Sequence, residues 1–171
     1  MEIRVAQPFL LPGVLQSADY AREVVRMGRP LDTSAEVDAA VERRVRRAAH
    51  LLREGGPRIT VLVPEHVIRA ARGIHPDALS HVLALAESAC VQLIPDGVHL
   101  AAATGAFRLI GFDDSRLPVL FAESAVGGSL VDHPALVARF VAAMNTLQGW
   151  AMSPDESRKR IEEANDDDRV E

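Results

Sequence analysis

Two glutamates occupy positions from which a carboxylate could move a proton. Glu65 follows the apolar run "RITVLVP", and Glu123 lies near the end of "LPVLFAES", so each is placed at the carboxyl end of an expected strand. Ligands of open sheets bind beyond such strand ends. If both carboxylates shared an apolar pocket, the pKa of one would rise and the pair would serve as general acid and base. Glu65 and Glu123 are therefore the candidate catalytic residues, with a structural role in bonding loop amides as the alternative.

Other polar side chains are candidates for holding a ligand. Arg69 follows Glu65 by one helical turn, where its guanidinium would grip an anionic group or form a surface ion pair. Gln16 and Tyr20 are spaced i, i+4 on one helix face, suited to hydrogen-bonding a small molecule or to packing in the core. His99 follows a "PDG" turn and carries an imidazole that titrates near neutral pH. The candidate ligand-binding residues are Gln16, Tyr20, Glu65, Arg69, His99 and Glu123.

A run of arginines in "VERRVRRAAH" forms a basic cluster on one expected helix. Most of the cluster is expected opposite an apolar stripe that includes Val41, Val45 and Ala48. Such a cluster either meets phosphates or an acidic partner, or forms a solvated helix face. Its members are Arg43, Arg44, Arg46 and Arg47.

Several chemistries lack the residues they need. The histidines show neither the helical pairing nor the cysteine spacing of a metal site, and the single Cys90 lies in an apolar stretch. No glycine-rich phosphate loop or dinucleotide motif occurs, so we expect no metal and no cofactor. The net charge of −5 argues against direct binding of nucleic acid by this chain. No apolar run is long enough to cross a membrane, and we expect a cytoplasmic protein.

The pattern of elements predicts an α+β fold. A proline-glycine elbow (residues 10–16) leads into a helix capped by Ser17, and a second helix starts at the capping box of Thr33 and Glu36. The run "RITVLVPE" reads as a central strand, and residues 106–124 read as a hairpin. We expect a single sheet of about four strands, packed with N-terminal and C-terminal helices.

The length of 171 residues suits one domain. We assign residues 1–164 to a single effector-binding or partner-binding domain. Residues 165–171, "NDDDRVE", are expected to form an acidic, frayed tail.

Several blocks along the chain carry a family resemblance: "LPGVLQSADYA", the strand ending at Glu65, "VQLIPDG", "GAF", "FAES" and "MSPDESRKRI". With these blocks the chain resembles the C-terminal domain of unknown function of actinobacterial, antitoxin-like helix-turn-helix transcriptional regulators of the XRE class. In those proteins the elbow follows the helix-turn-helix, for which this sequence has no room before residue 10. The resemblance implies a stand-alone, sensor-like regulatory domain.

Two functional hypotheses follow. The resemblance implies a domain that binds a small effector or a small protein partner and acts with a helix-turn-helix regulator in trans. The alternative is an enzyme, or an enzyme subunit, of a specialised-metabolite pathway that acts on an anionic small molecule with paired carboxylates. A homodimer built on the apolar helix stripes is compatible with either hypothesis.

Overall fold

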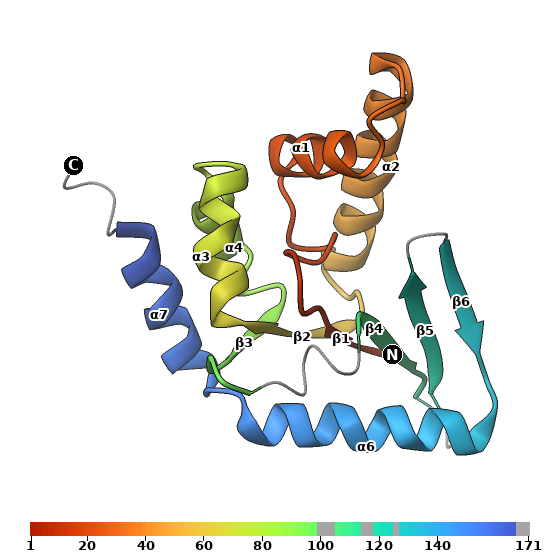
Figure 1. Cartoon of the computed structure of the whole chain (residues 1–171). Helices are drawn as coiled ribbons and strands as arrows, with labels where there is room; N and C mark the ends of the chain where they lie inside the picture. Colours follow the sequence, from red (N-terminus) through yellow and green to blue (C-terminus); the bar gives the residue numbers. More distant parts are fainter. Residues whose placement is uncertain (99–104, 114–117, 125–126, 167–171) are drawn as a thin grey trace.

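The computed structural model describes residues 1–98, 105–113, 118–124 and 127–166. In this part of the chain six strands form one sheet in the order β3-β2-β1-β4-β5-β6 (Figure 1). The strands are β1 (Glu2–Ala6), β2 (Arg58–Pro64), β3 (Cys90–Ile94), β4 (Phe107–Gly111), β5 (Val119–Ser124) and β6 (Gly127–Val131). The helices are α1 (Ala18–Gly28), α2 (Ser34–Leu52), α3 (Glu65–Ile74), α4 (Ala78–Ala84), α6 (Pro134–Trp150) and α7 (Pro154–Asp166).

The sheet is mixed, with β1, β2 and β3 parallel and β4, β5 and β6 added antiparallel. The α+β class, the central position of β2 and the β4–β5 hairpin are confirmed. The expectation of about four strands is wrong, because β1 and β6 also belong to the sheet. In β1 the charged Glu2 and Arg4 interrupt the apolar residues, and β6 begins with two glycines, which have low strand propensity.

Side chains of the strands alternate between two cores, as the strand period of two requires. On the upper face in Figure 1, Ile3, Val5 and Val61 pack with α3, α4, α7 and the elbow. On the lower face, Leu62 and Leu109 pack against α6, which runs along the sheet. The molecule therefore has three layers, with the sheet in the middle.

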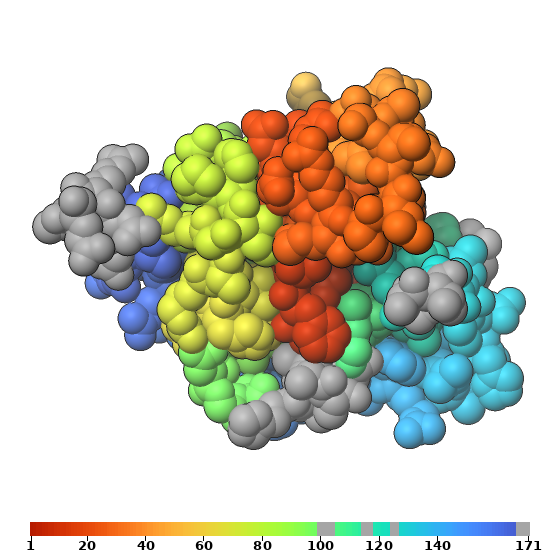
Figure 2. Space-filling model, turned by 45° about the horizontal axis from the view of Figure 1, so that its top comes forward, coloured from red at the N-terminus to blue at the C-terminus, as the bar shows by residue number. Residues whose placement is uncertain are grey.

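Helices α1 and α2 form a pair with a small core of their own, which includes Val37 and Val41 of α2. Helix α1 is capped by Ser17 and α2 by the capping box of Thr33 and Glu36, so both predicted starts are confirmed. The predicted stripe of α2 is wrong at Val45, which is 38 % exposed, whereas Leu52 packs against the core of the upper face as predicted. Figure 2 shows the elbow, α1 and α2 between α3 and α4 on one side and the β5–β6 side on the other.

Helix α7 covers the β3 edge of the sheet. The Leu93 amide donates to Ser157 Oγ at 2.9 Å, and the Met152 amide donates to the Leu93 carbonyl at 2.8 Å. The Gln92 side-chain amide donates to the Met152 carbonyl at 2.9 Å. These bonds occupy backbone groups that would otherwise offer a free edge to another chain.

None of the helices in the described ranges has the length and apolarity needed to cross a membrane. The expected limits of the domain and tail, 1–164 and 165–171, stay a prediction, and α7 runs as far as Asp166.

Candidate functional site

The elbow has a fixed conformation on the upper face of the sheet. The Leu15 amide donates to the Pro12 carbonyl at 2.8 Å and closes the turn. The Gln16 side-chain amide donates to the Leu11 carbonyl at 2.6 Å, and the Leu11 amide donates to the Tyr20 hydroxyl at 3.4 Å. Because Tyr20 is fully buried, this hydroxyl ties the start of the elbow to α1.

A cavity of about 190 Å³ lies between the elbow, the second half of α2 and the sheet. We call it the elbow cavity. Its apolar lining includes the buried side chains of Ile3, Val5 and Ile59, which belong to β1 and β2. Its polar lining residues are Gln7, Gln16, Arg44, Arg47, Arg108 and Glu123.

Arg44 is held between α2 and the elbow. Its stem lies against Gly13, where a Cβ atom would stand 3.5 Å from Arg44 Cγ. Its Nη1 donates to Gln16 Oε1 at 2.7 Å, so its hydrogen-bond partner is a neutral amide. Burial lowers the pKa of Arg44, the charge of Arg47 lowers it further, and Glu123 opposes the shift. The guanidinium stays protonated at neutral pH.

Arg108 and Glu123 face the cavity from neighbouring strands. Phe107 and Leu109 point to the lower core, so the strand alternation turns Arg108 to the upper face. Arg108 donates to Glu123 in an ion pair and lies over the Phe121 ring, 4.8 Å from its centroid. Burial lowers the pKa of Arg108, and Glu123 opposes this change.

A second cavity, of about 490 Å³, lies at the carboxyl ends of β2 and β3, and we call it the strand-end cavity. Its charged lining residues are Glu65, Arg69, Arg72, Arg160 and Glu163.

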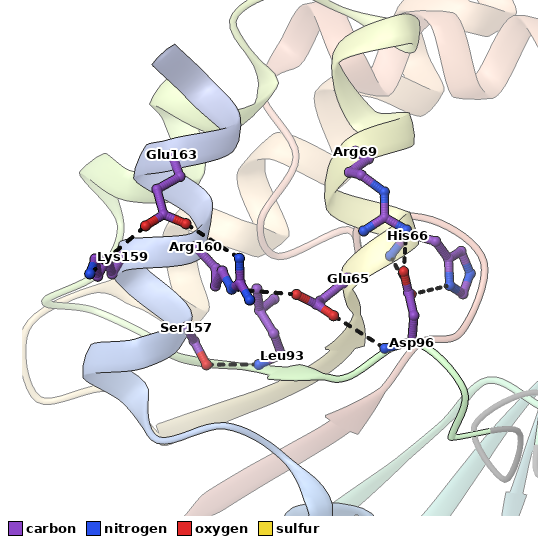
Figure 3. A network of polar contacts seen from close by, with 9 residues as sticks. All are labelled: Glu65, His66, Arg69, Leu93, Asp96, Ser157, Lys159, Arg160 and Glu163. Atoms are coloured by element: carbon purple, nitrogen blue, oxygen red, sulfur yellow. Dashed lines mark hydrogen bonds and ion pairs between the residues drawn. The ribbon is translucent and has the colours of Figure 1, made fainter. Parts of the chain in front are cut away.

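The charged groups around the strand-end cavity bind one another (Figure 3). Arg69 pairs with Asp96, and Arg160 lies 3.7 Å from Glu65 and 3.5 Å from Glu163. The backbone amide of Asp96 donates to Glu65 at 3.2 Å. Glu65 therefore joins the turn after β3 to α3 and α7.

Three further hydrogen bonds lie beside or within this network. Arg72 donates to the carbonyls of Ala164 and Asn165 in the last turn of α7, at 2.9 and 3.1 Å. The His66 amide donates to Asp96 Oδ1 at 3.2 Å. Hydrogen bonding to Arg69 lowers the pKa of Asp96.

The model of a family described as Domain of unknown function (DUF5753) matches residues 1–163. The chain belongs to this family. No curated protein and no solved structure gives a significant match to the chain. The matched range contains the whole lining of the elbow cavity and that of the strand-end cavity except Ala164.

The structure divides the predicted site residues between the two cavities. Gln16 and Glu123 line the elbow cavity, and Glu65 and Arg69 line the strand-end cavity. Strands β2 and β5 are three strand spacings apart, or roughly 14 Å. Glu65 and Glu123 therefore do not share a pocket and form no acid–base pair.

The two remaining candidates have other positions. Tyr20 is buried and lines neither cavity, and burial raises the pKa of its hydroxyl. His99 lies outside the described residues. Within the described ranges no group of three or more His, Cys, Asp and Glu side chains is placed to hold a metal ion.

Four polar lining residues of the elbow cavity were not among the predicted site residues: Gln7, Arg44, Arg47 and Arg108. Arg44 had a detectable signal, because Val37, Val41, Arg44 and Ala48 recur at i, i+4, i+7 and i+11. A charged residue inside an apolar stripe is a better indication of a site than a charged residue on an exposed face, because charged side chains are seldom buried. The exposed ion pair of Arg46 with Glu42 shows that one member of the basic cluster does lie on a solvated face.

Proposed function

We propose that the chain is a regulatory domain that binds a small effector molecule in the elbow cavity and acts through a protein partner. The supporting observation is that the elbow, α2 and the sheet form a partly open cavity, in which aliphatic side chains of the sheet and several polar side chains converge. Such a cavity is the usual form of a small-molecule site. The regulatory part of the proposal rests on the resemblance to the C-terminal domain of helix-turn-helix regulators.

The elbow cavity also offers a route from ligand to partner. Arg44 contacts both the cavity and Gln16 of the elbow, so a ligand that draws Arg44 away removes one tie between α2 and the elbow. Met27 near the end of α1 and Leu31 in the connection to α2 are exposed apolar side chains. A helix-turn-helix regulator acting in trans, or another small protein, would bind this helix pair and respond to a change in its position.

The enzyme alternative loses its main support in this geometry. It required Glu65 and Glu123 in one apolar pocket, and the two residues line separate cavities. Glu65 is occupied by an arginine and a backbone amide, as a structural residue would be.

Native mass spectrometry tests the proposal on the full chain purified from the organism that makes it. We expect a retained small molecule in the wild type. Ala48→Leu, which adds bulk to the cavity wall, is expected to lose that molecule, whereas Ala49→Leu on the exposed side of α2 is expected to keep it. A bare chain in the wild type, or equal retention in both variants, would contradict the proposal. A second protein or a second copy in the spectrum would identify the partner.

A further inference from the structure

The elbow cavity has more positive than negative charge in its lining. Arg44, Arg47 and Arg108 supply three guanidinium groups, and Glu123 is the single carboxylate among the described lining residues. Glu123 binds Arg108 and acts on Arg44 from a greater distance. Among the described residues, neither the half-buried Arg44 nor the exposed Arg47 has a carboxylate within ion-pair distance.

The position of Arg44 indicates what this excess of positive charge could bind. A guanidinium that leaves water loses hydration energy, which a neutral amide oxygen replaces only in part. The fork of an arginine matches the two oxygens of a carboxylate or phosphate group, and such charge-assisted bonds are among the strongest hydrogen bonds in proteins. An anion beside Arg44 would supply the negative charge that the described part of the chain does not place in contact with this guanidinium.

The positive wall extends beyond the elbow cavity. Arg44 and Arg47 also line a neighbouring groove between α1 and α2, together with Arg29 and Arg43. Of these, Arg29 lies 3.6 Å from Asp32. The charged end of the site is therefore at Arg44 and Arg47, where the cavity and the groove meet.

The opposite wall of the elbow cavity is apolar and the space is small. Ile3, Val5 and Ile59 present buried aliphatic side chains from the sheet. The volume of about 190 Å³ is below the range of roughly 300–1,000 Å³ typical of pockets for drug-sized ligands. The cavity thus suits a molecule with one charged group and a short apolar body.

We propose that the effector is a small organic anion whose carboxylate or phosphate group binds between Arg44 and Arg47 while its apolar body lies against Ile3, Val5 and Ile59. This inference rests on the proposed function, because it names the ligand class of the same cavity. The negative charge of Glu123 acts on Arg44 as well as on Arg108, so it competes with the bound anion and limits its affinity.

Titrations of the full chain followed by NMR test the ligand class. The probes are hexanoate and hexyl phosphate as anions, hexanamide as the neutral analogue and hexylammonium as the cation. We expect at least one anion to bind about tenfold or more tightly than hexanamide, with shifts at the Nε–H groups of Arg44 and Arg47. The better anion distinguishes a carboxylate from a phosphate ligand.

Variants locate the charged group. Arg47→Gln removes a charge without removing a hydrogen bond between described residues, and it is expected to weaken binding of the anion about tenfold. Arg44→Gln is expected to weaken it at least as much. Arg46→Gln is the matched control, because Arg46 pairs with Glu42 and lines neither the cavity nor the groove.

Three results would overturn the inference. Hexanamide or hexylammonium binding as tightly as the anions would show that charge is not selected. Unchanged affinity in both Arg44→Gln and Arg47→Gln would place the anion elsewhere. If neither anion binds while native mass spectrometry finds a molecule lost in Ala48→Leu, the inference fails and the proposed function stands. If no molecule is retained and no probe binds, both fail.

Discussion

The strand-end cavity and the elbow cavity each have three arginines in their lining, but the arginines have different partners. At the strand ends, Arg69 and Arg160 bind carboxylates and Arg72 binds the carbonyls of the last turn of α7. In the elbow cavity, among the described residues, only Arg108 pairs with a carboxylate. The larger cavity therefore has carboxylates on two of its arginines and helix-end carbonyls on the third, whereas the smaller cavity has a carboxylate on one.

This contrast separates structural charge from charge available to a ligand. An arginine whose donors are used inside the chain joins elements, as Arg72 joins α3 to α7. An arginine that bonds to a neutral amide beside an apolar cavity keeps an electrostatic demand that an anion can meet. Volume alone would favour the strand-end cavity, and the pairing of charges favours the elbow cavity.

The largest expected effect concerns stability at the strand-end side. Ser157→Ala removes the hydroxyl that accepts the Leu93 amide and leaves that buried donor without its partner. We expect the free energy of unfolding to fall by about 1–3 kcal/mol, measured by denaturant unfolding. Binding of a small anion in the elbow cavity should not change. Ser34→Ala, at an exposed serine, is the control, and an equal effect of both changes would contradict the assigned role of Ser157.

A matched pair of glutamate changes sharpens the comparison between the cavities. Glu123→Gln frees Arg108 from its carboxylate and is expected to tighten anion binding by about threefold to tenfold, or about 0.7–1.4 kcal/mol. Glu65→Gln is expected to leave anion binding unchanged, because Glu65 lines the other cavity. Calorimetric titration of both variants with the same anion measures the difference. Weaker binding in Glu123→Gln would mean that the carboxylate helps the ligand rather than competes with it.

Much of the fold follows from local signals in the sequence. The caps at Ser17 and Thr33 are formed as predicted, because side-chain oxygens that satisfy free helix amides act within one turn. The central strand β2 was predictable from its continuous apolar run. The strand β6 was missed because it begins with Gly127 and Gly128 and has exposed side chains, and β1 was missed because Glu2 and Arg4 interrupt its apolar residues. Their pairing depends on partners distant in sequence.

The site was less predictable because it is assembled from distant segments. Gln16 and Glu123 were identified as candidates, but the fold alone brings them to one cavity. The sequence pattern predicts an apolar stripe that continues from Val41 to Val45, and this stripe leaves Arg44 in the basic cluster. A shift of one residue along a helix turns the side chain by about 100°, which moves Arg44 from the solvent side to the cavity. The ion pair of Arg69 with Asp96 needed the turn after β3 to be placed beside α3.

The smallest expected effect is the dependence of stability on pH at the strand ends. Hydrogen bonding to Arg69 holds the pKa of Asp96 below its ordinary value of 3.8, so the folded state favours the carboxylate. This contribution is present above the unfolded pKa and is lost as the pH falls through the lower folded pKa. Both side chains are more than two-fifths exposed, so the contribution is about 0.5 kcal/mol after screening by solvent. Wild type should therefore lose more stability than Asp96→Asn between pH 5 and about pH 3, measured by thermal unfolding. Equal losses of stability in both proteins would show that the Arg69–Asp96 pair does not stabilise the fold. Anion binding in the elbow cavity should stay constant from about pH 6 to about pH 8, because guanidinium groups do not titrate in that range.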